Sequence, residues 1–258
     1  MRIELKRKLG KLWPAPSHSR KIILLYHSIS GSPWAMFEKT FNDQIDWIND
    51  HCDVLSLTDL LQSPPKEKIQ VAITFDDGYV SLYDKVAAKL SEKNMDATVY
   101  INTGWIGDGS AKRKKSYPKL GHYPEESFMI WPEIEDLHRA GWEIGSHGVN
   151  HYNLAQLTSD VLETELSHSK YHIEEQLQKP CIHLAYPFGR YSKTVKDFAS
   201  TIGYQYAAAA YHAPLKNNCD LFAFPRLNIA KEYSMHDFKN IIHGKWDYLK
   251  FIHKMKGF

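Results

Sequence analysis

Short runs of hydrophobic residues alternate along this chain with longer segments in which hydrophobic side chains recur every three or four positions. Short runs are typical of buried strands, and the longer spacing is typical of amphipathic helices. The runs predict strands at 21–27, 54–57, 70–74, 97–101, 143–146, 181–185, 206–210 and 227–229. The spacing predicts helices at 81–93, 131–140, 158–178, 192–202 and from 235 onward.

This alternation indicates βαβ units and a largely parallel sheet in an α/β protein. Seven or eight such strands would close into a barrel, whose catalytic residues lie at the carboxyl ends of the strands. We expect residues 1–20 to form a basic N-terminal segment and residues 21–258 to form the barrel domain.

Two adjacent carboxylates follow the strand predicted at 70–74. They are Asp76 and Asp77, in the string Thr-Phe-Asp-Asp-Gly. Neighbouring negative charges repel, and a cation bound to one of them would remove the conflict while the other stays ionised. A simple Asp-Gly turn is the alternative interpretation.

Two imidazoles, His147 and His151, follow the strand predicted at 143–146 and therefore belong to the same edge of the barrel. Two histidines and one aspartate form a suitable ligand set for a catalytic divalent metal with an open position. The second aspartate would then serve as a base, which points to hydrolysis by a metal-activated water. Chance clustering in an ordinary barrel is the structural alternative.

With these two motifs the chain resembles the polysaccharide deacetylases of carbohydrate esterase family 4 over about residues 21–238. The resemblance implies a single-domain, distorted (β/α) barrel of seven or eight strands. It implies that Asp76 is the general base and that Asp77, His147 and His151 hold a divalent metal, which we expect to be Zn²⁺.

The family's third motif is matched only in part. Ala185 stands where many members have an arginine that holds the catalytic aspartate, and we predict that Arg226 takes its place in space. A fold-stabilising pair is the alternative for Arg226. By resemblance, a backbone N–H near Phe188 would stabilise the oxyanion. The expected substrate-binding residues are Tyr186, Pro187, Phe188, Gly189 and Trp105.

The general acid would be a histidine that protonates the leaving amine. His27, at the exit of the first strand, ranks first; His212 and His243 follow. The Tyr26-His27 pair, the Ala-Tyr-Pro-Phe-Gly segment and the late Pro-Arg pair together resemble deacetylases of poly-N-acetylglucosamine and related surface glycans.

Composition and charge limit the class of protein and its partners further. The net charge of +2 gives no argument for a nucleic-acid partner, and three cysteines make neither a disulfide framework nor a zinc knuckle. Proline and polar residues follow the basic start of the chain, so we expect no secretory signal and a cytoplasmic protein. The basic, aromatic ends suggest peripheral contact with the inner membrane face; a docked terminal helix is the alternative.

A long polar insertion at 104–130 is either a functional loop or a solvated surface loop. It carries the basic run 112–115, which would suit the diphosphate of a lipid-linked sugar.

We therefore expect a metal-dependent N-deacetylase acting on N-acetylated amino sugars of a bacterial surface glycan or its lipid-linked precursor. The alternatives are a deformylase or deacylase of another sugar amide, a peptidoglycan deacetylase, and an inactive glycan-binding barrel. The presence of all four residues of the two motifs argues against the inactive barrel.

Overall fold

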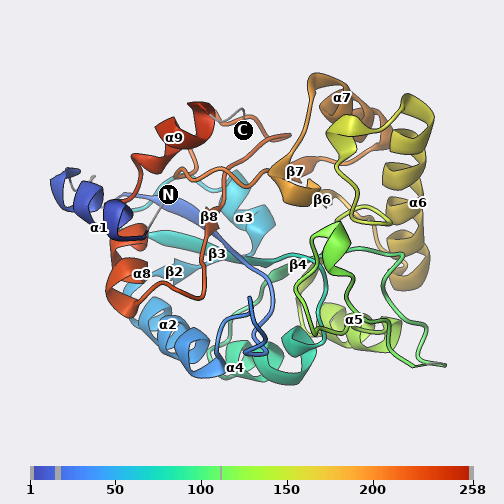
Figure 1. The fold of residues 1–258 in the computed structure, drawn as a ribbon, viewed down its shortest axis with the longest axis horizontal. Helices are drawn as coiled ribbons and strands as arrows, with labels where there is room; N and C mark the ends of the chain where they lie inside the picture. The colour runs from blue at the N-terminus through green and yellow to red at the C-terminus, as the bar shows by residue number, and fades with distance from the viewer. Residues whose placement is uncertain (1–2, 15–18, 111, 256–258) are drawn as a thin grey trace.

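A parallel β-sheet curves through the centre of the molecule, as the computed structural model of residues 3–14, 19–110 and 112–255 shows (Figure 1). Seven strands are hydrogen-bonded in the order β7-β6-β5-β4-β3-β1-β8, and β2 pairs with the first half of β3. The strands are β1 (Lys21–Tyr26), β2 (Asp53–Val54), β3 (Gln70–Phe75), β4 (Thr98–Ile101), β5 (Glu143–Ser146), β6 (His183–Ala185), β7 (Tyr206–Ala208) and β8 (Leu227–Asn228).

The helices are α1 (Ile3–Leu12), α2 (Glu38–His51), α3 (Leu57–Gln62), α4 (Ala87–Glu92), α5 (Trp131–Arg139), α6 (Ser159–Leu177), α7 (Lys193–Ile202), α8 (Met235–Ile242) and α9 (Leu249–Met255). Most of them lie outside the curved sheet, whereas α3 lies within the ring of strands (Figure 1), where its Leu57 and Leu60 belong to one buried cluster with Tyr100. A π-helical turn, η1 (Leu82–Val86), leads into α4. Three short 3₁₀ turns complete the described elements: η2 (Pro118–Leu120), η3 (Leu154–Gln156) and η4 (Pro187–Gly189).

The barrel is distorted where its two outer strands meet. Ala208, at the end of β7, makes a parallel bridge to Phe224, just before β8. The N–H of Arg226 donates to the carbonyl of Tyr211 at 3.3 Å across the same junction. The predicted fold, a distorted (β/α) barrel in one domain, is confirmed.

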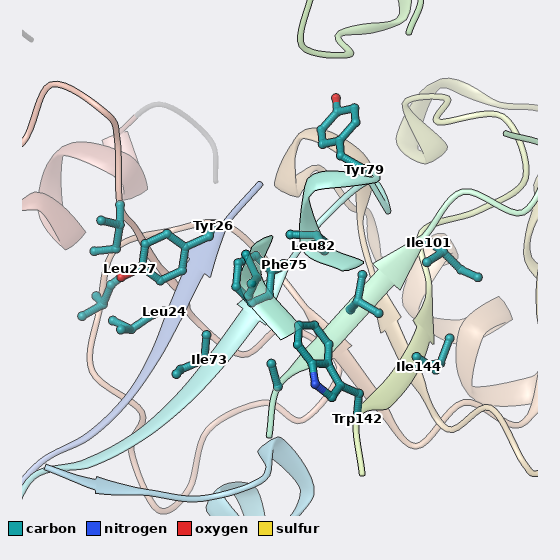
Figure 2. Close-up of a cluster of buried hydrophobic side chains, with 14 of the residues drawn as sticks. Leu24, Tyr26, Ile73, Phe75, Tyr79, Leu82, Ile101, Trp142, Ile144 and Leu227 are labelled. Carbon is teal, nitrogen blue, oxygen red and sulfur yellow. The ribbon is translucent and has the colours of Figure 1, made fainter. Parts of the chain in front are cut away.

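Aromatic packing fixes the two central strands, β1 and β3, in which every residue is buried. Phe75 stacks on Trp142 at 5.7 Å between ring centroids and packs against Tyr26 at 5.6 Å (Figure 2). Burial of one such ring contributes about 1.5–3 kcal/mol to stability. The end of β3 is therefore a rigid platform for the residues that follow it.

The predicted strands all occur, with ends that differ by up to three residues. The hydrophobic pattern did not lead us to predict α2 and α3. The apolar face of α2 consists of Phe41, Ile45 and Ile48, which recur at helical spacing between polar residues. No side chain caps its first turn, so the usual start signal is absent.

The N-terminal helix α1 packs on the barrel domain. Arg7 donates two hydrogen bonds to Asp237, at 2.9 and 2.7 Å, and Lys6 Nζ lies 2.6 Å from the hydroxyl oxygen of Tyr233. A Cβ at Gly10 would come within 2.8 Å of Trp246, so close approach of the helix requires glycine here. The domain boundary at residue 20 stays a prediction. Of the helices described, none is long and apolar enough to cross a bilayer.

Candidate active site

Three side chains converge where β3 and β5 end. Asp77 Oδ1 lies 3.4 Å from His151 Nε2 and 3.7 Å from His147 Nε2. The three candidate ligand atoms lie within 4.8 Å of one another, and all three side chains are buried. Parallel strands deliver their carboxyl ends to the same edge, which explains how residues 70 positions apart meet.

Backbone carbonyls orient both imidazoles. Nδ1 of His147 lies 2.8 Å from the oxygen of Ala185, and Nδ1 of His151 lies 2.6 Å from the oxygen of Leu120. A carbonyl only accepts, so Nδ1 carries the proton and Nε2 faces the cluster with a lone pair. Burial lowers the pKa of His147 to about 4, which keeps this imidazole neutral at pH 7.

The three residues fit a divalent cation. Asp77 Oδ1 is fully buried and has no hydrogen-bond partner among the described residues. Such an oxygen is costly to bury unless something positive binds it. Asp77 also has φ +75°, a left-handed conformation that is strained for a residue with a Cβ and is typical of functional sites. One carboxylate oxygen and two imidazole nitrogens are suitable ligands for zinc-like metals.

Asp76 has a separate partner. Its two oxygens accept hydrogen bonds from Nη1 and Nη2 of Arg226, at 2.6 and 2.8 Å. Burial alone would raise the pKa of Asp76, but the guanidinium of Arg226, together with His147 and His27, outweighs burial and brings it to about 2. The carboxylate is therefore ionised at neutral pH. Its Oδ2 lies 3.9 Å from His147 Nε2, at the side of the candidate metal centre.

Arg226 is completely buried, and its position is fixed on several sides. Its Nε donates to the carbonyl of Ala209 at 2.9 Å, and its guanidinium lies 5.2 Å from the ring centroid of Tyr100. Its Nη1 also lies 3.4 Å from the hydroxyl of Thr74. The structure thus brings to Asp76 the arginine that the sequence analysis placed there.

A cavity of about 180 Å³ opens onto these groups. His27, at the exit of β1, lines it together with both aspartates and both histidines of the cluster. The ring of His27 stacks on Tyr123 at 5.0 Å and 11°. The remaining lining residues are Leu25, Gly121, Phe188, Gly189, Ala210 and Asn228.

Comparison with known proteins identifies this arrangement. The sequence profile named polysaccharide deacetylase matches residues 63–207, more than half of the chain. The chain belongs to the polysaccharide deacetylase family. Its enzymes hydrolyse N-acetyl amide bonds and depend on a metal.

Individual relatives agree with this family. YxkH of Bacillus subtilis, whose name assigns it to the polysaccharide deacetylases, is 27% identical over 81% of this chain and 71% of its own length. The poly-beta-1,6-N-acetyl-D-glucosamine N-deacetylase of Staphylococcus aureus is 22% identical over 83% and 72%. The deacetylase PplD of Streptococcus pyogenes, solved with acetate, has the same fold, with a TM-score of 0.73, 22% identity and coverage of 88% and 99%.

The third motif of this polysaccharide deacetylase contributes unevenly to the cavity. Phe188 and Gly189 line it, and both have left-handed backbones, at φ +60° and +66°. Tyr186 and Pro187 are buried, and the Tyr186 hydroxyl donates to Phe222 O. Trp105 packs against the rings of His122 and Phe128 and is not among the residues that line the cavity.

The other two histidines considered as acids lie elsewhere. His212 is buried two residues beyond Ala210, which itself lines the cavity. His243 caps the end of α8 in the helical layer, where its ring contacts Trp47 at 5.7 Å. Of the three candidates, His27 is the one that lines the cavity.

Two functional contacts escaped the sequence reading. The polar insertion provides Leu120, whose carbonyl orients His151, so this loop forms part of the site. Glu165 on α6 accepts hydrogen bonds from the N–H groups of Val149 and Asn150, at 3.0 Å each, and so fixes the loop between the two histidines. Any residue can provide a backbone carbonyl, so the sequence does not indicate the role of Leu120. Glu165 lies in a helix with several other acidic residues, and nothing in the sequence distinguishes it from them.

Proposed function

We propose that this protein removes acetyl groups from N-acetylglucosamine units of a bacterial surface glycan. One observation carries the proposal: an ionised carboxylate, Asp76, stands beside the Asp77, His147 and His151 cluster in one cavity but keeps its own partner, Arg226. A hydrolase needs such a division of labour between ligands and base. Family membership supplies the reaction class.

Asp77, His147 and His151 would hold the divalent metal, which we propose is Zn²⁺. When bound, such a metal polarises the amide carbonyl and lowers the pKa of water. Asp76 accepts the proton of the attacking water, and Arg226 keeps that carboxylate ionised and oriented. The backbone at Phe188, with its left-handed conformation at the cavity wall, would present an N–H to the developing oxyanion.

His27 completes the reaction by protonating the leaving amine. It lines the same cavity on the side of β1, and its stack on Tyr123 restricts the orientation of the ring. A positioned imidazole of this kind is the commonest general acid at neutral pH. The products are acetate and a glucosamine unit.

The substrate class rests on relatives. The name of the Staphylococcus aureus relative specifies a poly-beta-1,6-N-acetyl-D-glucosamine. Incubation with β-1,6-linked N-acetylglucosamine oligomers should release acetate and generate one free amine per acetate. Release from N-formyl sugars or peptidoglycan fragments alone would show a different amide substrate.

We further propose that the substrate is presented at the inner membrane face, on lipid or beside it. α1 exposes Leu5 and Leu12 together with Lys8 and Lys11, a combination that suits an anionic bilayer surface. Co-sedimentation with phosphatidylglycerol vesicles tests this. Leu12→Ser should weaken vesicle binding, and unchanged sedimentation would contradict the contact.

A further inference from the structure

An aromatic path leads from the catalytic cavity to the surface. His27 lines the cavity and stacks face to face on Tyr123, at 5.0 Å and 11°. Tyr123 in turn makes a T-shaped contact with Trp34, at 5.8 Å between ring centroids and 84° between ring planes. Trp34 lies in the loop after β1 and is 52% exposed. The indole therefore lies at the outer end of this path, one ring beyond Tyr123, and is half exposed to solvent.

The loop that carries Trp34 is held in place from two sides. The buried carboxylate of Glu126 accepts hydrogen bonds from the hydroxyls of Ser30 and Ser32, the second at 2.7 Å. Lys231 Nζ donates to the carbonyl of Pro33 at 2.5 Å. A single exposed tryptophan needs no explanation in general. Here, however, polar contacts fix the backbone on either side of it and hold the indole against Tyr123, which stacks on the cavity residue His27.

The size of the cavity limits what it can hold. Its volume of about 180 Å³ is below the roughly 300–1,000 Å³ of sites that enclose drug-sized ligands. One sugar unit and its acetamide would fill it, so the neighbouring units of a polymer must lie outside, on the rim. The C–H face of a pyranose is apolar and packs well on an aromatic ring.

We propose that Trp34, supported by Tyr123, is a subsite for the sugar unit next to the one being deacetylated. This inference rests on the proposed function. Such a subsite makes the enzyme selective for oligomers over the single sugar. The contact should stabilise the bound substrate and the transition state equally, because Trp34 lies away from the reacting amide. It should therefore act on KM and leave kcat unchanged.

The test is acetate release from N-acetylglucosamine oligomers of one to six units. Trp34→Ala should raise KM roughly tenfold for the longer oligomers and leave the monomer unchanged, and Trp34→Phe should restore most of the loss. Tyr171→Ala, which removes an exposed aromatic ring from α6, is the matched control and should behave as wild type. Equal effects of Trp34→Ala at every length, or none, would overturn the subsite.

A binding measurement separates this inference from the proposed function. Calorimetric titration of the pentamer into the Asp76→Asn variant reads binding without turnover. Addition of Trp34→Ala to that variant should weaken binding by a similar factor. If wild type released no acetate from any oligomer, the proposed function would fail, while this titration would still decide whether Trp34 binds the glycan. Unchanged affinity would refute the subsite.

Discussion

The guanidinium of Arg226 and the carboxylate of Asp76 form a two-point ion pair across 150 positions of sequence. Both side chains are buried, so each charge depends on the other for compensation. The pair joins the end of β3 to the start of β8. It therefore contributes both to the barrel junction and to the charge state of the proposed base.

Arg226→Met should destabilise the protein by about 3–5 kcal/mol, because it leaves the carboxylate of Asp76 buried without its partner. It should also raise the pKa of Asp76, so the acid limb of the kcat/KM profile moves to higher pH. Urea unfolding at pH 7 and a pH–rate profile measure the two effects.

The double variant Arg226→Met with Asp76→Asn is the control for this pair. It removes both charges and should be more stable than Arg226→Met alone, because no uncompensated charge remains. In the wild type, the stability from the lowered pKa of Asp76 is complete above about pH 4 and is lost as pH falls towards 2. Simple additivity of the two substitutions would contradict a direct interaction.

Glu165→Gln should weaken metal binding by about 10–100-fold, since Glu165 fixes the loop that carries His151 without touching the cluster itself. Calorimetric titration of the metal measures the change. Glu163→Gln, an exposed carboxylate on the same helix, is the matched control and should bind like wild type. If both variants lost affinity equally, the loss would reflect the charge of the helix and not the anchored loop.

Glu143, at the end of the barrel opposite the candidate site, should make the free energy of unfolding depend on pH. Its carboxylate accepts hydrogen bonds from the N–H groups of Leu57 and Thr58 and from the Thr98 hydroxyl. Burial would raise the pKa of Glu143, but the interaction with His183 and these donors lowers it from 4.5 to about 2.

The lowered pKa means that Glu143 contributes its stability above pH 4.5 and loses it as pH falls towards 2. Glu143→Gln should therefore cost on the order of 2–3 kcal/mol at pH 7 and much less at pH 3. Urea unfolding of both proteins at the two pH values measures this difference. A constant difference between them would show that ionisation plays no part.

His27→Ala should lower kcat at least a hundredfold while the metal stays bound, because it removes the proton donor for the leaving amine. Metal analysis and steady-state kinetics on the same preparation give both readings. His236→Ala, at an exposed position on α8, is the control and should leave both unchanged. A fully active His27→Ala protein would assign the acid to another group.

Most of the candidate site could be predicted from short local motifs in the sequence. Asp76, Asp77, His147 and His151 stand directly after strands, so their convergence follows from parallel pairing alone. Contacts that depend on tertiary packing were out of reach. The carbonyl of Leu120 is one such contact, because any residue could supply it, and the stack of Tyr123 on His27 depends on the path of a long irregular insertion.

The fold shows the same division. Continuous apolar runs revealed β1 and β3, whereas α2 escaped because three core residues are spaced among polar ones and no cap marks its start. The contact of Arg226 with Asp76 was predicted only from the resemblance to the family, because Ala185 occupies the position at which many members have an arginine. Burial and charge explain that contact once the barrel brings β8 beside β1.

The central claim is that two neighbouring carboxylates have different tasks, and one paired measurement tests it directly. Bound zinc per protein and acetate release are determined for wild type, Asp76→Asn and Asp77→Asn. Asp76→Asn should retain about one metal ion and lose turnover by at least a hundredfold, whereas Asp77→Asn should lose the metal and turnover together. Full activity in Asp76→Asn, or full metal content in Asp77→Asn, would contradict the account.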